Sequence, residues 1–157
     1  MSESASASAS DVVLRSFQPD DAAALVELWR RCDLVRPQNN PHADIARKCA
    51  VDPAGLIVAA AAAGEGAILG SVMVGYEGHR GWINYLAVDP SRRRSGLGRR
   101  LMAAAEAYLR EIGCPKINLQ VRTTNRDVLA FYAAIGFLPD DVVSLGKRLI
   151  EDRGASG

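Results

Sequence analysis

The chain has 157 residues, 48% of them hydrophobic and 24% charged, which is typical of one folded domain with a packed core and excludes a disordered chain. Lys and Arg number 19 against 18 Asp and Glu, and the net charge of +1 argues against broad, non-specific nucleic-acid binding, which needs a clear basic excess. The longest apolar run, 56–63, is far shorter than the ~20 residues of a membrane helix.

The cysteines and the N-terminal residues indicate a cytoplasmic protein without metal. The chain has three cysteines, Cys32, Cys49 and Cys114, and no two of them form a Cys-x-x-Cys motif. Neither a disulfide framework nor a zinc site is therefore expected. Residues 1–10 form a Ser/Ala tract that lacks the basic start and apolar stretch of a signal peptide. We therefore predict a disordered tail at 1–10 and one domain at 11–152.

The first third of the chain predicts one strand and two helices. Residues 12–17 favour a strand, and Pro19 suits the first position of the helix that follows, whose apolar residues recur at helical spacing. A polar loop at 33–40 ends in an Asn-Pro pair. Asn40 is the expected cap of a second helix that runs to about Val51.

The middle of the chain predicts three strands joined by short turns. The strands are expected at 56–61, 68–76 and 82–88. The turns between them fall at 64–66 and 77–80, which makes each pair of neighbours antiparallel.

The remainder predicts two helices and further strands. A long apolar stripe indicates a helix at 97–112, stopped by Gly113. A strand at 117–121 and a short helix at 125–135 follow, and one or two strands are expected within 137–149. This mixture predicts an α/β or α+β fold with helices on both faces of the sheet.

The strongest functional signal is the passage from Leu86 to Arg99, where a strand leads into a glycine-containing loop and then a helix. The first N–H groups of a helix are unpaired and carry about +0.5 charge in sum, which favours an anion. Gly96 and Gly98 let a phosphate approach the backbone. A plain tight turn beside solvated arginines is the alternative, but strand, loop, arginines and helix agree on a pyrophosphate site. The chain lacks a Gly-Lys-Ser/Thr loop and a third glycine near Leu101, which excludes the two other common phosphate motifs.

The pattern Arg93-x-x-Gly96-x-Gly98 is similar to the Gln/Arg-x-x-Gly-x-Gly/Ala signature of the GCN5-related N-acetyltransferase (GNAT) family. Asn125, Tyr132 and Gly136-Phe137 are spaced like the family's next segment, and the resemblance covers about 13–149. It implies a mixed, mostly antiparallel central sheet of six to seven strands flanked by about four helices. Three segments most resemble the YpeA-type bacterial acetyltransferases: Trp29-x-x-Cys32-Asp33-Leu34, Gly75-Tyr76-x-Gly78-His79-Arg80 and Ser144-Leu145-Gly146-Lys147-Arg148-Leu149.

The resemblance implies acetyl-CoA as cosubstrate. The strand backbone around Leu86 would pair with the pantetheine arm and polarise the thioester carbonyl, and the loop N–H groups would hold the pyrophosphate. Tyr132 would protonate the departing thiolate, although its apolar helix face also fits a core aromatic. The implied cofactor-binding residues are Leu86, Ala87, Val88, Arg93, Arg94, Ser95, Gly96, Leu97, Gly98, Arg99, Asn125 and Tyr132.

The acceptor side is less defined by the sequence. A protonated amine cannot attack a carbonyl, so a base or a water chain must take its proton. Glu77 is the first candidate, followed by His79, Asp33 and Asp44. The expected substrate-binding residues are Asp33, Arg36, Asn39 and His79, and their mixed charge suits a small zwitterionic amine at least as well as a protein tail.

The sequence therefore predicts an N-acetyltransferase that moves an acetyl group from acetyl-CoA to a primary amine by direct attack in a ternary complex. A non-catalytic acyl-CoA sensor of the same fold is the first alternative, and a nucleic-acid binder that uses Arg92–Arg94 is the second. We expect a small-molecule or protein amine as acceptor, a monomer or homodimer, and no metal, membrane or nucleic-acid partner.

Overall fold

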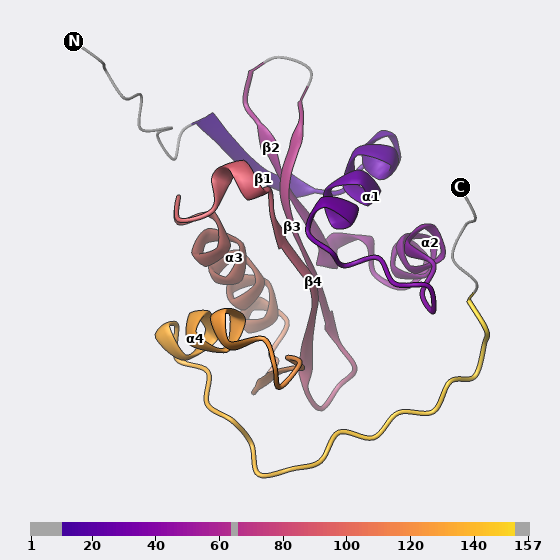
Figure 1. Ribbon diagram of the computed structural model, residues 1–157, viewed down its shortest axis with the longest axis vertical. Helices are drawn as coiled ribbons and strands as arrows, with labels where there is room; N and C mark the ends of the chain where they lie inside the picture. The colour runs from indigo at the N-terminus through magenta and orange to yellow at the C-terminus, as the bar shows by residue number, and fades with distance from the viewer. Residues whose placement is uncertain (1–10, 64–65, 153–157) are drawn as a thin grey trace.

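The computed structural model describes residues 11–63 and 66–152, so the tail predicted at 1–10 lies outside the described residues. A five-stranded sheet runs through the centre of the molecule (Figure 1), with its strands in chain order. The first four strands pair antiparallel, and the fifth is parallel to the fourth. The strands are β1 (Val12–Ser16), β2 (Leu56–Ala61), β3 (Ile68–Tyr76), β4 (Gly81–Val88) and β5 (Ile117–Leu119).

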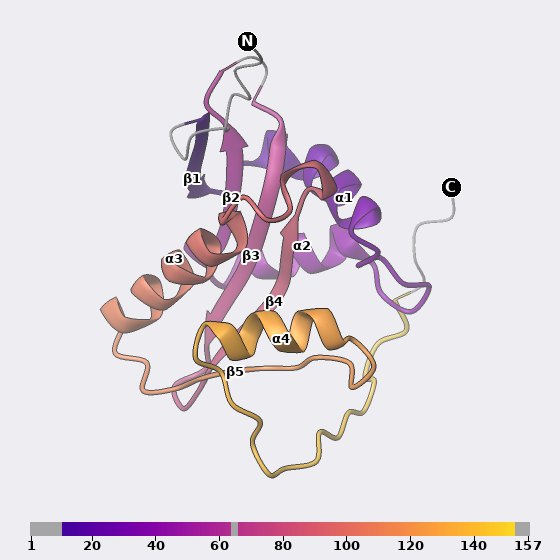
Figure 2. The same ribbon diagram turned by 60° about the vertical axis from the view of Figure 1, so that its left-hand side comes forward.

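Helices cover both faces of the sheet, as the sequence predicts (Figures 1 and 2). On one face lie α1 (Ala22–Arg31) and α2 (Pro41–Val51), and on the other lie α3 (Leu97–Glu111) and α4 (Arg126–Ala134). Each face has its own apolar core, because a sheet between two helical layers buries side chains in both directions.

The predicted caps and apolar stripes explain the helices. In α1, Leu25, Leu28 and Trp29 recur at helical spacing and are completely buried. The side chain of Asn40 accepts a hydrogen bond from the backbone N–H of Ala43 at 3.1 Å, which caps α2 as predicted. The long helix α3 buries Leu97 to Leu109 along one stripe against the sheet.

The strands predicted within 137–149 are not formed, so the sheet of the described residues has five strands rather than six or seven. Ion pairs tie this C-terminal segment, residues 138–152, to Lys116 through Asp140 and to Arg47 through Asp152, and its apolar side chains stay exposed. Pro139 lacks an N–H, and the apolar run is broken at Gly146, which weakens strand pairing. The segment consequently passes around the molecule without joining the edge of β5 (Figure 2).

A β-bulge interrupts the pairing of β3 with β4 and is hydrogen-bonded to the core. Ser71 pairs with Ala87 and Met73 with Asn84, so one residue of β3 faces two residues of β4. Tyr85, one of these two residues, has a φ of +51°. The completely buried Ser71 hydroxyl accepts from Trp29 Nε1 at 2.9 Å and donates to the Tyr85 carbonyl at 2.8 Å, which locks the bulge to α1.

Replacing Ser71 with Ala is expected to lower the free energy of unfolding by about 2 kcal/mol, because it leaves the Trp29 N–H and the Tyr85 carbonyl buried without a partner. The measurement is a urea unfolding curve followed by circular dichroism. Ser16→Ala, at an exposed serine of β1, is the matched control and should stay within about 0.5 kcal/mol of wild type. Equal stabilities of the two variants would contradict the role given to Ser71.

Candidate functional site

The edge of β4 that faces β5 is open beyond the bulge. β4 pairs with β5 only through Gly81, Trp82 and Ile83. Residues 84–88 have no strand partner on that side among the residues that the structure describes. This open edge carries Leu86, Ala87 and Val88, and its backbone groups are available to an extended ligand that lies as a further strand.

The loop after β4 is held by α1. Asp89 accepts hydrogen bonds from the backbone N–H and the hydroxyl of Ser91 at 2.9 and 2.8 Å, and it forms an ion pair of 2.8 Å with Arg31. Those hydrogen bonds and the charges of Arg31 and Arg92 outweigh desolvation by burial and lower the pKa of Asp89, so the carboxylate remains charged. The Cys32 thiol donates to the Val88 carbonyl at 3.3 Å. These contacts fix the loop directly before the glycine pattern.

The glycine pattern forms the start of α3. Gly96 caps the helix with a φ of +83°, a left-handed conformation that other residues adopt at a cost, and a Cβ there would meet no atom within 4 Å. Gly98 serves packing instead, since a Cβ would lie 3.3 Å from the Phe131 ring of α4. The loop and first turn expose Arg93, Arg94, Ser95, Gly96 and Arg99, whereas Leu97 is buried.

The open edge of β4 and the start of α3 together form one candidate anion-binding site. The unpaired N–H groups of the first helical turn favour negative charge, and the exposed Arg93 and Arg94 add positive charge beside them. Leu86 to Arg99 form one continuous stretch of chain, so an extended ligand could contact both parts.

Tyr132 lies in α4, in the same core as α3. Its ring packs edge-on against Phe131 and Phe137, with ring centroids 5.2 and 5.4 Å away. Burial raises its pKa from 10.0 to about 12, so its hydroxyl keeps the proton at neutral pH. Within the described residues this hydroxyl makes no hydrogen bond, which leaves its proton available to a ligand.

Asn125 caps α4. Its side-chain oxygen accepts from the Val128 N–H at 3.3 Å. The side chain is exposed, and its amide N–H groups have no partner among the described residues. A structural role as cap is thus established, and contact with a cofactor stays a prediction.

The structure does not bring Glu77 and His79 together with the other predicted residues. Both lie at the tip of the β3–β4 hairpin, where the Glu77 carboxylate accepts from the backbone N–H of His79 at 2.8 Å and from that of Arg80. These hydrogen bonds, led by that from Arg80, lower the pKa of Glu77 and make it a weaker base. Ser71, the partner of Ala87, lies six residues before Glu77 along an extended strand, about 20 Å at 3.3 Å per residue.

The residues around Tyr85 form a polar cluster on the α1 and α2 face. The Tyr85 hydroxyl accepts from the Asn39 amide at 2.8 Å and donates to the Asp44 carboxylate at 2.6 Å. Its ring stacks on Trp29 with a centroid distance of 3.8 Å. Burial and the neighbouring Asp44 raise the pKa of Tyr85 and keep it protonated. The sequence analysis named Asn39 and Asp44 as candidates but not Tyr85. Tyr85 lies within a predicted strand, and nothing in the local sequence indicates a bulge there.

The other predicted acceptor residues lie in the loop before α2. Asp33 and Arg36 form an exposed ion pair of 3.4 Å, and the Arg36 N–H donates to the Asn39 side chain at 2.7 Å. Asn39 therefore links this loop to the cluster, whereas Asp33 faces solvent with 82% of its side chain exposed.

The described part of the chain lacks two further features. Across residues 11–63 and 66–152, no group of three or more His, Cys, Asp or Glu side chains is placed to hold a metal ion. In the same residues, no helix combines the length and apolar character needed to cross a membrane.

The glycine loop between β4 and α3 is the feature on which the resemblance to the GNAT family rests. Residues 22–137 match the model of the acetyltransferase (GNAT) family, and the chain belongs to that family. An acetyltransferase of Pectobacterium atrosepticum is 46% identical over 140 residues, which is 89% of this chain and 97% of that protein. The chain is thus an acetyltransferase of the GNAT type.

Solved structures show the same fold. The Ard1 structure from Thermoplasma volcanium is similar with a TM-score of 0.69 and 26% identity, covering 82% of this chain and 83% of that one. The NatC complex bound to Gag peptide and CoA contains a chain with a TM-score of 0.72 and 21% identity, covering 82% and 85%, which is a likeness of fold alone.

The raised pKa of Tyr132 predicts a loss of stability in alkali. An unfolded tyrosine ionises near pH 10 and the folded one near 12, so the contribution is complete below about pH 10 and falls as the pH rises toward 12. Between pH 9 and 11, Tyr132→Phe should lose about 1 kcal/mol less unfolding free energy than wild type. Urea unfolding at several pH values measures this difference, and parallel curves for the two proteins would show that the phenol is not buried as described.

Proposed function

We propose that this acetyltransferase takes the acetyl group from acetyl-CoA and transfers it to a primary amine by direct attack within a ternary complex. The observation that carries the proposal is the continuity of the open β4 edge with the start of α3. An extended arm that ends in a pyrophosphate matches this order of a strand edge followed by an anion site.

The residues present fit such a ligand. The backbone of Leu86, Ala87 and Val88 would hold the pantetheine arm, and N–H groups from Arg93 to Arg99 would hold the pyrophosphate. Gly96 supports this fit, because the space beside its α-carbon is open and its left-handed conformation turns the loop into the helix. When bound, acetyl-CoA supplies an acetyl group activated as a thioester.

The chain's own residues then move two protons. A bond forms between the amine nitrogen and the acetyl carbon, the bond from that carbon to sulfur breaks, and the amine loses one proton. We assign the proton for the departing thiolate to the Tyr132 hydroxyl, which burial keeps protonated. An N–H near Leu86 or Ala87 would polarise the carbonyl, an effect typically worth about 3–4 kcal/mol.

For the amine proton we favour Asp44 over Glu77, acting directly or through water. Asp44 binds the hydroxyl of Tyr85, so its carboxylate lies one tyrosine side chain from the bulge of β4. Glu77 lies at the far tip of the β3–β4 hairpin, where its carboxylate accepts hydrogen bonds from two backbone N–H groups. A role for Glu77 or His79 would need a long water relay.

A glutamate at Gly96 tests acetyl-CoA binding. Gly96→Glu places a negative side chain where phosphate should bind, whereas Gly78→Glu makes the same change at another left-handed glycine, with φ +103°, at the hairpin tip. Acetyl-CoA at about 100 times its Kd should stabilise wild type and Gly78→Glu by about 2.7 kcal/mol, seen as a rise in Tm. Gly96→Glu should show no rise. An equal rise in a folded Gly96→Glu protein would overturn the assignment of the loop.

An acceptor screen separates an enzyme from a non-catalytic acyl-CoA sensor. With acetyl-CoA and pools of amines, free thiol should appear, and the acceptor identified should be acetylated. Tyr132→Phe keeps the ring packing but loses the proton donor, so its turnover should fall at least tenfold, within or just below the ~10²–10⁴ range of acid catalysis. Acetyl-CoA affinity should remain as in wild type.

The acceptor screen and the Tyr132→Phe variant can each contradict a different part of the proposal. Absence of thiol release with every amine, together with intact acetyl-CoA binding, would favour the sensor. Unchanged turnover in Tyr132→Phe, with the chemical step rate-limiting, would place Tyr132 among the core aromatics only.

A further inference from the structure

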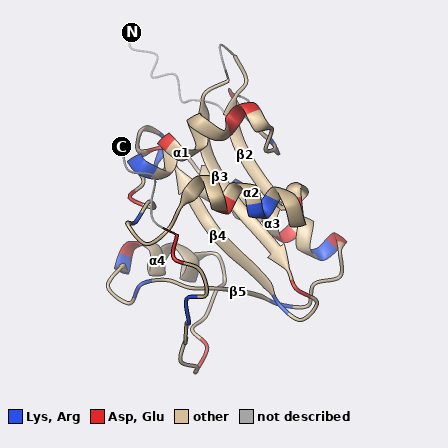
Figure 3. Cartoon of the chain, turned by 90° about the vertical axis from the view of Figure 1, so that its right-hand side faces the viewer, with Lys and Arg blue, Asp and Glu red and all other residues tan. Residues whose placement is uncertain are grey.

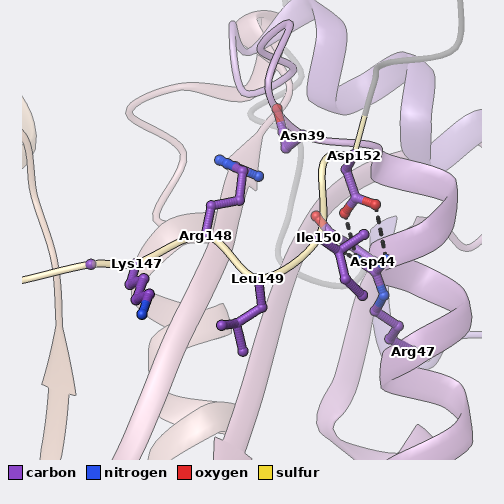
Figure 4. A pocket seen from close by; sticks show the side chains of 9 residues that line it. Asn39, Asp44, Arg47, Lys147, Arg148, Leu149, Ile150 and Asp152 are labelled. Carbon is purple, nitrogen blue, oxygen red and sulfur yellow. Dashed lines mark hydrogen bonds and ion pairs between the residues drawn. The ribbon is translucent and has the colours of Figure 1, made fainter.

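A cavity of about 760 Å³ lies between α2 and the C-terminal segment (Figure 4). Its size is within the range of small-molecule sites. Residues of both signs line it, and Figure 3 shows basic and acidic residues on α2 and on this segment. The proposed transfer uses only Asp44 from this cavity.

The anionic end of the cavity lies next to the bulge. Asp44 accepts the hydrogen bond of Tyr85 through one oxygen, and its other oxygen faces Arg47 at 3.5 Å. About 28% of the Asp44 side chain is exposed. An amine held at Asp44 therefore lies about one tyrosine side chain from the β4 backbone that the proposed function assigns to the thioester.

The cationic end lies on the C-terminal segment. The Asp152 carboxylate accepts two hydrogen bonds from the Arg47 guanidinium, at 2.5 and 2.9 Å. Lys147 and Arg148 form no ion pair within the described residues, and Figure 4 shows the Arg148 side chain directed toward the Asn39 end of the cavity, with Lys147 on the other side. Three cationic and two acidic side chains line the cavity, so its lining carries a net charge of +1.

We propose that the acceptor is a small primary amine that also carries a carboxylate, such as a free amino acid, with its amino group at Asp44 and its carboxylate at Arg148. This inference rests on the proposed function and adds the substrate class. The planar guanidinium of Arg148 matches a carboxylate with two parallel hydrogen bonds, and the Asp44 carboxylate matches the amino group of the same zwitterion. Arg148 is then a specificity residue, since an amine without the carboxylate leaves it unpaired.

The test is binding of matched ligands by isothermal titration calorimetry in the presence of saturating CoA. The ligands are free amino acids, each beside its carboxamide and its decarboxylated amine. At least one amino acid should bind wild type, and its carboxamide should bind about tenfold more weakly, the effect of one charge-assisted hydrogen bond. Arg148→Gln should abolish this difference. Arg110→Gln, at an exposed arginine of α3 outside the cavity, is the matched control and should keep it.

Each of the following results would overturn the inference: equal binding of amino acid and carboxamide by wild type, a preference that survives in Arg148→Gln, or binding only of amines without a carboxylate. Failure of every amino acid to bind would also overturn it. The proposed function is read separately, by thiol release from acetyl-CoA with the same ligands. Selective binding that depends on Arg148 without thiol release would keep the site and refute the transfer.

Discussion

The hydroxyl of Ser71 is the contact on which the candidate site depends. It is completely buried, accepts from Trp29 in α1 and donates to the carbonyl of Tyr85 in β4. A buried hydroxyl with both partners in place fixes their relative position, because losing either leaves a costly unpaired group. The bulge that it holds lies within residues 84–88, the part of β4 that has no partner in β5 among the described residues.

The same bulge serves both sides of the sheet. Its backbone borders the open edge that we assign to the donor, and the side chain of Tyr85 reaches through the α1 and α2 layer to Asn39 and Asp44. Stacking on Trp29 limits the movement of that ring. In the proposed reaction, Tyr85 would position both the donor and the acceptor site, and a direct transfer needs such a close approach.

The two tyrosines near the site are kept protonated by different surroundings. Around Tyr132 the cause is burial among aromatic rings, which leaves its hydroxyl protonated and without a partner in the described residues. Around Tyr85 burial acts together with Asp44, which takes the hydroxyl proton in a hydrogen bond and makes this residue a positioning group. The two phenol groups are chemically the same, and the difference between them comes from their surroundings: burial at Tyr132, and burial together with Asp44 at Tyr85.

The helices, the five strands and the glycine-containing loop before α3 were predictable from the sequence. Hydrophobic periodicity, the Asn40 cap, Gly96 and Gly98 are local signals. Prediction from the sequence failed for residues 138–152, whose apolar side chains suggested strands, since strand formation requires a partner edge and the ion pairs to Lys116 and Arg47 hold the segment elsewhere. The antiparallel hairpin already implied that Glu77 lies several residues from the Leu86 and Ala87 backbone, whereas the contact of Tyr85 with Asn39 and Asp44 emerged from the folded structure. Strand register and the meeting of α2 with β4 are long-range contacts, and no local pattern encodes them.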